Sequence, residues 1–284
     1  MTGSPPRSRS LSLASLTLAS LTLASLTVGA LAGCAISQQQ EIQLGNDYAA
    51  QLATQLPLIR DAQVTQYITS LGNSLARQTD SRGLTWHFTV VNSTEVNAFA
   101  VPGGWVYVNR GLIERAQNMS ELAGVLAHEI GHVTRRHSVE QMQQAQGANT
   151  GLALVCTLTN VCENGATQAA INVGGSALFA RFSRSDENEA DAEAVKTTVK
   201  AGIDPHGIPE MFRILLTERK RNPGGLNAFF ASHPLEEDRI AATETLIARY
   251  PASQLRGLSR DTREFQRFRS RLRSLPPPPT PRAN

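Results

Sequence analysis

The stretch His128-Glu129-Ile130-Gly131-His132 constrains this chain more than any other part of its sequence. On an α-helix, side chains four residues apart lie about 40° apart around the axis and one turn along it, so both imidazoles can converge on one ion. A glutamate directly after the first histidine is the usual general base of a zinc peptidase. Because five residues can also match by chance on a buried helix, other parts of the chain must supply independent support.

The segment around this stretch is predicted to be a helix with an apolar face and a separate histidine face. It begins at Asn118, where Glu121 three residues later is typical of a capping box. The stripe that we expect in the core consists of Leu122, Val125, Leu126, Ile130 and Val133. Both histidines lie roughly 120° from the centre of this stripe, whereas histidines placed for packing would more often lie within it. Gly124 and Gly131 lie near them, where another backbone or a substrate can approach closely.

A catalytic zinc site needs three protein ligands, so a third must come from elsewhere in the chain. Glu187 and Asp191 lie four residues apart on a strongly polar predicted helix over residues 181–200. A carboxylate can complete a site of two histidines and one glutamate, and a nearby aspartate can orient a ligand histidine. A solvated acidic helix face is the alternative. His137 lies about 140° around the helix from His132, so we expect its side chain to be solvated.

Residues 1–33 are predicted to be an export signal and not part of the fold. Two arginines precede an apolar run over residues 11–31, which leads into Leu31-Ala32-Gly33-Cys34. This ending resembles the lipobox of bacterial lipoproteins, in which the cysteine, here Cys34, becomes the lipidated N-terminus. Because Ala35 follows it, and not the aspartate associated with inner-membrane retention, the resemblance implies sorting to the outer membrane. An uncleaved membrane anchor is the alternative.

Composition and charge restrict the range of partners. The chain has 284 residues, of which 41% are hydrophobic, so it can bury a sizeable core. Its net charge is +3, and without Arg7 and Arg9 it falls to about +1 (3 − 2), which argues against nucleic acid as the main partner. With Cys34 lipidated, Cys156 and Cys162 remain as a candidate disulfide in an oxidising compartment, and two free buried thiols are the alternative.

The remaining sequence predicts further helices and a few short strands. Helices are expected over residues 36–58, 61–79, 210–221 and 233–250, with two loosely specified helices over 138–180. Residues 84–91 alternate as a strand does, and residues 97–109 predict two strands around Pro102-Gly103-Gly104. Proline suits an edge strand, which beside an active site can bind an extended peptide, while a plain hairpin turn is the alternative. For the arginine-rich part of the chain from Ser259, which includes Pro276 to Pro279, we expect a solvated, partly disordered end, with attraction to anionic lipid or polysaccharide as the alternative.

Several motifs in a fixed order resemble peptidase family M48, in particular its bacterial lipoprotein members. The residues that carry the resemblance are Asn97 to Gly104, Glu121 to His132, Ser183-Arg184 with Glu187 to Asp191, Ala201 to Pro205, and Ser232-His233-Pro234 with Arg239. The resemblance implies an α+β fold, in which a mostly helical zincin-like (gluzincin) domain contains a small β-sheet whose edge strand lines the active-site cleft. We expect no counterpart of the tetratricopeptide repeats that some members carry.

The resemblance also implies a role for each candidate residue. His128, His132 and Glu187 would bind one Zn²⁺ ion. Glu129 would act as general base and then general acid, and Asp191 would hold a ligand histidine from behind. The edge strand that binds substrate would consist of Val101, Pro102, Gly103, Gly104, Trp105 and Val106.

His233 has two implied roles and one structural alternative. By resemblance it would either stabilise the oxyanion or occupy the fourth metal position in a latent state. A residue at a helix N-terminus, packed by Pro234, is the alternative.

The function implied by the resemblance is that of a zinc metalloendopeptidase of the cell envelope, acting on misfolded or unassembled periplasmic and outer-membrane proteins. We expect a signal peptide over residues 1–33, an M48-like domain over 34–250 and a tail over 251–284. The mature chain would be lipid-anchored in the outer membrane of a Gram-negative bacterium and face the periplasm. The alternative function is that of a low-turnover, chaperone-like lipoprotein that assists outer-membrane protein assembly together with the assembly machinery.

Overall fold

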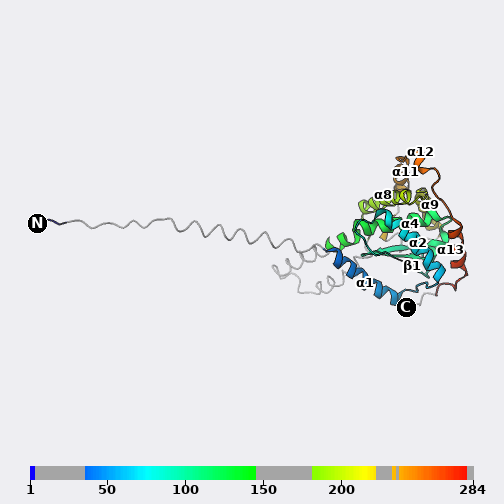
Figure 1. Ribbon diagram of the computed structural model, residues 1–284, viewed down its shortest axis with the longest axis horizontal. Helices are drawn as coiled ribbons and strands as arrows, with labels where there is room; N and C mark the ends of the chain where they lie inside the picture. Colours follow the sequence, from blue (N-terminus) through cyan, green and yellow to red (C-terminus); the bar gives the residue numbers. More distant parts are fainter. Residues whose placement is uncertain (4–35, 145–180, 222–231, 235–236, 280–284) are drawn as a thin grey trace. The chain divides into compact units, whose positions relative to one another are not determined.

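A small β-sheet covered by helices forms the fold of the described part of the chain (Figure 1). The computed structural model describes residues 1–3, 36–144, 181–221, 232–234 and 237–279, and those from Ile36 onward belong to one compact unit. In chain order the elements are α1 (Gln38–Gln55), α2 (Ala62–Thr79), β1 (His87–Val91), β2 (Ala98–Val101), β3 (Trp105–Asn109), α3 (Arg110–Arg115), α4 (Met119–Arg135), α8 (Arg184–Lys200), α9 (Gly207–Arg221), α11 (Glu237–Ala248), α12 (Ala252–Leu255) and α13 (Arg263–Ser274).

The strands are ordered β1-β3-β2, so that β3 is central and β2 lies at an edge. β1 runs parallel to β3, with His87 opposite Trp105. β2 runs antiparallel to β3, with Ala98 opposite Val108. The mostly helical α+β fold with a small sheet, as expected from the sequence, is confirmed.

Alternation along each strand gives the sheet two different apolar faces. The residues that face α2 and α4 and join the main core are Phe88, Val90, Ala98, Val106 and Val108. The residues that instead join a second cluster with Leu44, Tyr48 and Leu52 of α1 are Val91, Phe99, Val101, Trp105 and Tyr107. The sheet is therefore covered by α1 on one face and by α2 and α4 on the other.

The turn between β2 and β3 interrupts the substrate strand that we expected over Val101 to Val106. Val101 ends the edge strand β2, whereas Val106 lies in the central strand β3. Between them, Gly103 and Gly104 have φ angles of 81° and 102°, a backbone region that strongly favours glycine. The carbonyl oxygen of Pro102 packs closely against α1. The prediction of a single edge strand is therefore wrong for the residues after the turn, because they belong to the central strand.

Helix α4 is the centre of the main core and is buried on all sides. Every residue from Met119 to Val133 is buried, not only the predicted apolar stripe. The helix packs against α2, α8, α9 and the sheet, and Figure 1 shows it between the sheet and the pair α8 and α9. A Cβ atom on Gly131 would lie 3.1 Å from the carbonyl oxygen of Ala190, and one on Gly124 would lie 3.3 Å from the backbone Cα of Ile208. The expectation that another backbone approaches closely at these two glycines is confirmed.

The start of α4 is capped nearly as predicted. Asn118 Oδ1 accepts a hydrogen bond from the backbone N–H of Glu121. The carboxylate of Glu121 accepts from the backbone N–H of Gln117, one residue before the position that a capping box uses. The other long helices predicted from the sequence are confirmed as α1, α2, α8, α9 and α11, and the predicted strands as β1, β2 and β3.

The C-terminal region differs from the solvated end that we expected. Helix α13 buries Phe265, Phe268 and Leu272 in the main core. Phe268 stacks on Tyr67 of α2 with ring centroids 4.4 Å apart. The prediction is wrong for these residues because it was based on the many arginines of this segment and overlooked three apolar residues that have helical spacing.

Some predictions fall on residues outside the described part of the chain. The signal segment over residues 4–33, Cys34, the cysteines Cys156 and Cys162, and most of residues 138–180 lie there. Among the described residues, no helix combines the length and apolarity needed to cross a bilayer.

Candidate metal centre

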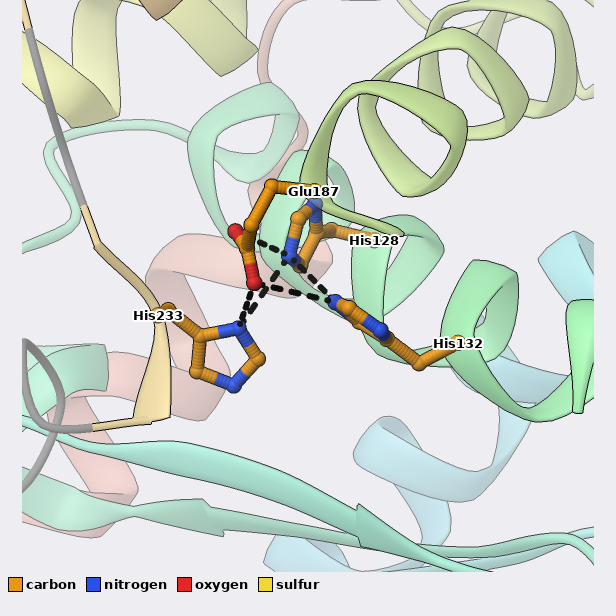
Figure 2. Close-up of side chains that lie close together, drawn as sticks. All are labelled: His128, His132, Glu187 and His233. Carbon is orange, nitrogen blue, oxygen red and sulfur yellow. Dashed lines mark hydrogen bonds and ion pairs between the residues drawn. The ribbon is translucent and has the colours of Figure 1, made fainter. Parts of the chain in front are cut away.

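Three segments of the fold bring three imidazoles and one carboxylate to a common point (Figure 2). His128 and His132 lie one turn apart on α4, and Glu187 lies in the first turn of α8. His233 comes from the short described segment that precedes α11. All four side chains are buried, with at most 4% of each residue exposed. One candidate ligand atom from each lies within 4.8 Å of those from the others.

The spacing of these atoms fits a tetrahedral metal site. His128 Nε2 lies 3.0 Å from His132 Nε2 and 3.5 Å from Glu187 Oε2. His233 Nδ1 lies 3.5 Å from His128 Nε2 and 2.9 Å from Glu187 Oε1. Ligands about 2.1 Å from zinc at tetrahedral corners are about 3.4 Å from one another, and imidazole nitrogens with a carboxylate oxygen are ligands that zinc prefers. The four residues therefore fit a single zinc ion.

Glu129 lies beside this cluster with one carboxylate oxygen unused. The residue is 1% exposed, and its Oε1 atom has no hydrogen-bond partner among the described residues. The same atom lies 3.6 Å from His233 Nε2. A buried carboxylate oxygen without a donor is costly, so its position beside four metal-binding groups fits an oxygen that accepts a proton or hydrogen bond from a bound water.

Asp191 and Arg239 contact the cluster residues on the side away from the common point. His128 Nδ1 lies 2.9 Å from Asp191 Oδ1, a contact that fixes the imidazole so that Nε2 faces the cluster. Arg239 donates to both oxygens of Asp191, at 2.8 Å and 2.7 Å. Another nitrogen of Arg239 lies 2.5 Å from Glu187 Oε2 and donates to the carbonyl oxygen of Pro234. One buried guanidinium therefore offsets two buried carboxylates and ties α11 to α8.

The electrostatic environment keeps both carboxylates ionised. Burial raises the pKa of Glu187, but electrostatic interaction with His233 and a hydrogen bond from His128 outweigh burial and lower it. Burial likewise raises the pKa of Asp191, and the charge of Arg239 reverses this effect. For His128, burial opposes protonation, but hydrogen bonds to Asp191 and Glu187 raise its pKa to about 9. Burial lowers the pKa of His132, so this ring is neutral, which is the form that binds metals.

His137 does not have the solvated position that we expected. It is 3% exposed, and its Nδ1 lies 2.9 Å from Nδ1 of His132. The prediction is wrong because α4 ends at Arg135 and the left-handed residue Arg136 turns the chain back toward His132. Sequence spacing alone therefore missed His137, and it also gave no role to Arg239, whose only signal was its place in the last motif.

The structure brings together most of the candidate residues named from the sequence. His128, His132, Glu187 and His233 form the cluster, with Glu129 at its side. The segment from Val101 to Val106 is not among them, since it lies in the sheet and in a turn that packs on α1. A His-Glu-x-x-His helix joined by a glutamate from a second helix is the arrangement of thermolysin-like zinc peptidases. Fold and site therefore define this protein as a metallopeptidase.

Comparison with known proteins identifies the family. The model for peptidase family M48 matches residues 62–247, and the chain belongs to this family. The resemblance recognised from the motifs is thereby confirmed. A metalloprotease of this family acts on peptide substrates, and the buried His and Glu residues are consistent with zinc as its metal.

Similar proteins include bacterial and mitochondrial metalloproteases. The chain is 35% identical over 231 residues to the β-barrel assembly-enhancing protease of Escherichia coli K12. This match covers 79% of this chain and 46% of the relative. It is 28% identical to metalloprotease YcaL of the same strain, over 66% of this chain and 74% of the relative. It is 33% identical to mitochondrial metalloendopeptidase OMA1 of Arabidopsis thaliana, over 55% of this chain and 30% of the relative. This chain thus spans about half the length of the β-barrel assembly-enhancing proteases that it matches.

Proposed function

We propose that this chain is a zinc endopeptidase in which His128, His132 and Glu187 bind the metal and Glu129 is the general base. The observation that carries the proposal is the buried, unpartnered Oε1 atom of Glu129 beside the four-residue cluster. A zinc ion bound there would supply Lewis-acid polarisation of a peptide carbonyl and of a water molecule.

The protein's own residues would move and hold the proton. Glu129 takes a proton from the attacking water and returns it to the leaving amine when the peptide bond breaks. Its burial supports this exchange, because no bulk water competes for the carboxylate. Asp191 and Arg239 would keep His128 oriented during the reaction, since their hydrogen bonds leave the ring one favoured position.

The edge strand β2 is the proposed binding strand for an extended peptide. Ala98–Val101 forms one edge of the sheet, and its middle residues Phe99 and Ala100 are partly exposed. An extended peptide can pair with such an edge through main-chain hydrogen bonds. This assignment replaces the longer segment expected from the sequence, and a peptide footprint mapped to β3 instead would contradict it.

The proposed substrates are misfolded or unassembled envelope proteins. The similarity to a protease whose name refers to β-barrel assembly supports this substrate class, and so does the predicted export signal with Cys34 as the lipidated residue. The proposed location is the periplasmic face of the outer membrane. Mass spectrometry of the mature N-terminus should show a diacylglyceryl-modified Cys34, and an unmodified chain that starts at Met1 would contradict the location.

The experiment that tests the proposed chemistry uses Glu129→Gln. This substitution removes the base but keeps the shape and the metal ligands, so we expect bound zinc to be retained and the cleavage rate of casein to fall by about 10²–10⁴. The control is Glu264→Gln on α13, whose side chain is 62% exposed and far along the chain from the site. We expect this control to cleave casein as fast as the unmodified protein.

The same experiment separates the peptidase from a chaperone-like protein. A protein that only escorts outer-membrane proteins has no need of a base at position 129. Unchanged casein cleavage in Glu129→Gln would refute the mechanism. Zinc binding without any measurable cleavage by the unmodified protein would favour the low-turnover alternative.

A further inference from the structure

The second nitrogen of each α4 histidine has a different partner. His128 Nδ1 faces the carboxylate of Asp191, whereas His132 Nδ1 lies 2.9 Å from His137 Nδ1. Two imidazole nitrogens at this distance form a hydrogen bond only when one carries a proton and the other accepts it. A histidine that binds a metal through Nε2 carries its proton on Nδ1. His132 would therefore donate, and His137 Nδ1 would accept.

The position of His137 depends on an unusual backbone conformation. Five residues after His132, a continued helix would place His137 about 140° around the axis and away from it. Instead, Arg136 adopts a left-handed conformation with φ of 63° and ψ of 27°, which is uncommon for a residue other than glycine. Its guanidinium is held by the fully buried Glu41 at 2.8 Å and by the carbonyl oxygen of Ile36 at 2.6 Å. These contacts from α1 and from the residue that precedes its N-cap compensate for the cost of the turn.

The surroundings of His137 restrict its ring further. Its Nε2 atom lies 3.9 Å from Glu189 Oε2 on α8, so the nitrogen that carries the proton faces an acceptor charge. Phe182 stacks on His132 with ring centroids 4.0 Å apart and lies against His137 at 6.2 Å. The ring of His132 is thus limited on one face by an aromatic side chain and at Nδ1 by an imidazole.

We propose that His137 is a positioning residue that fixes the ring orientation and the proton position of the metal ligand His132. This proposal rests on the proposed function, since it takes His132 as a ligand. By accepting the Nδ1 proton, His137 leaves the lone pair of His132 Nε2 directed at the cluster. It does for His132 what Asp191 does for His128, but without adding a further negative charge to the site.

The test compares three substitutions at this position in the full-length protein. His137→Phe keeps the ring volume and removes the acceptor, and we expect zinc binding to weaken about 10–100-fold. His137→Asn places an amide oxygen near the position of Nδ1, so it should restore most of the affinity. His137→Gln places its amide further from the backbone, near the position of Nε2, and should restore less zinc affinity than His137→Asn does. His206→Phe is the matched control, because the His206 side chain is 48% exposed, and it should bind zinc normally.

Two measurements separate positioning from general stability. The zinc dissociation constant is obtained by competition with a chelator, and the visible spectrum of the cobalt(II)-loaded protein reports the ligand geometry at the metal. A folded His137→Phe variant with unchanged zinc affinity and an unchanged cobalt spectrum would overturn the proposal. If the His137→Phe variant does not fold, the zinc affinities of His137→Asn and His137→Gln are compared instead. Tighter zinc binding by Asn supports the proposal, and equal or reversed affinities overturn it.

Neither readout depends on peptide cleavage. An unmodified protein that binds zinc but does not cleave casein would contradict the proposed peptidase activity and leave the order of zinc affinities valid. A proteolytically active protein whose zinc affinity is the same with Phe or His at position 137 would contradict only the positioning role.

Discussion

His233 differs from the other three residues of the metal cluster because it lies in the described residues 232–234, outside α4 and α8. Its Nδ1 atom lies 2.9 Å from Glu187 and 3.5 Å from His128, which places it where a fourth protein ligand would lie. A catalytic zinc site leaves the fourth position for water or substrate, whereas a structural site fills it with protein. This geometry favours the latent-state role of His233 over the oxyanion role.

At the residue scale, His233→Ala should therefore increase activity. Removing the imidazole opens the fourth position, so we expect casein cleavage to rise several-fold at saturating zinc while zinc itself binds less tightly. The rate is measured by release of labelled casein fragments, with His206→Ala as the exposed control. A fall in the cleavage rate at saturating zinc would instead assign His233 to the oxyanion.

The residues of the metal cluster and Asp191 were predictable from the sequence, but the positions of His137 and Arg239 were not. His128 and His132 follow from helical spacing, which depends only on local geometry, whereas Glu187 was indicated by the resemblance to family M48. The position of His137 depends on the left-handed turn at Arg136, and that of Arg239 depends on how α11 packs against α8. Both positions result from tertiary contacts between segments that are distant in sequence, so they cannot be predicted from residue spacing along one helix.

Helix α4 determines the site geometry because α8 lies very close to it at Gly131. A Cβ atom there would lie 3.1 Å from the carbonyl oxygen and 3.2 Å from the Cα of Ala190. Both contacts are to backbone atoms, which cannot rotate away as a flexible side chain can. Since α8 also carries Glu187, the distance between the two helices determines how closely the carboxylate approaches the histidines.

At the element scale, Gly131→Ala should destabilise the protein and weaken its zinc site. In an exposed helix, replacing glycine with alanine stabilises by about 1 kcal/mol, so a loss here reports the helix contact. We expect a loss of about 1–3 kcal/mol in urea unfolding, with a larger loss for Gly131→Val. Zinc affinity should fall in the same order. Equal unfolding midpoints for all three proteins would show that α8 can move away freely.

The helices and strands themselves were largely predictable. Apolar spacing indicated α1, α2 and α4, alternation indicated β1, and the Pro-Gly-Gly turn indicated β2 and β3. The complete burial of α4 was not predictable, because small and polar residues on its other faces look solvated in a sequence. They are buried only because α8 and α9 pack against them.

Across the whole molecule, α13 joins the beginning and the end of the described core. Phe265 and Phe268 pack against Tyr67 of α2, and Arg271 pairs with Asp61 at 2.7 Å. The predicted domain boundary at residue 250 would cut between these contacts. The compact unit instead extends beyond it, since three buried apolar residues of α13 belong to the main core.

Substitution of Phe265 should show that α13 is part of the core. Phe265 is completely buried, so Phe265→Ala should lower the free energy of unfolding by about 3–5 kcal/mol. Arg267→Ala, two residues away with a side chain that is 75% exposed, should change it by about 0.5 kcal/mol or less. The two variants are compared by urea unfolding. If both variants lose the same free energy of unfolding, or if Phe265→Ala loses less than about 1 kcal/mol, then α13 is a peripheral segment and not part of the core.

The contact between α13 and α2 also has a consequence for the order of events during synthesis. Asp61 and Arg271 are 210 residues apart in the chain, and closing a flexible loop of that length costs about 5 kcal/mol in chain entropy. The surface of α2 that receives α13 stays uncovered until α13 itself has been made. Helix α4, which carries both candidate ligand histidines, packs on α2 as well, so α4 and α13 share this neighbour. The core around this helix is therefore complete only after α13 has been made.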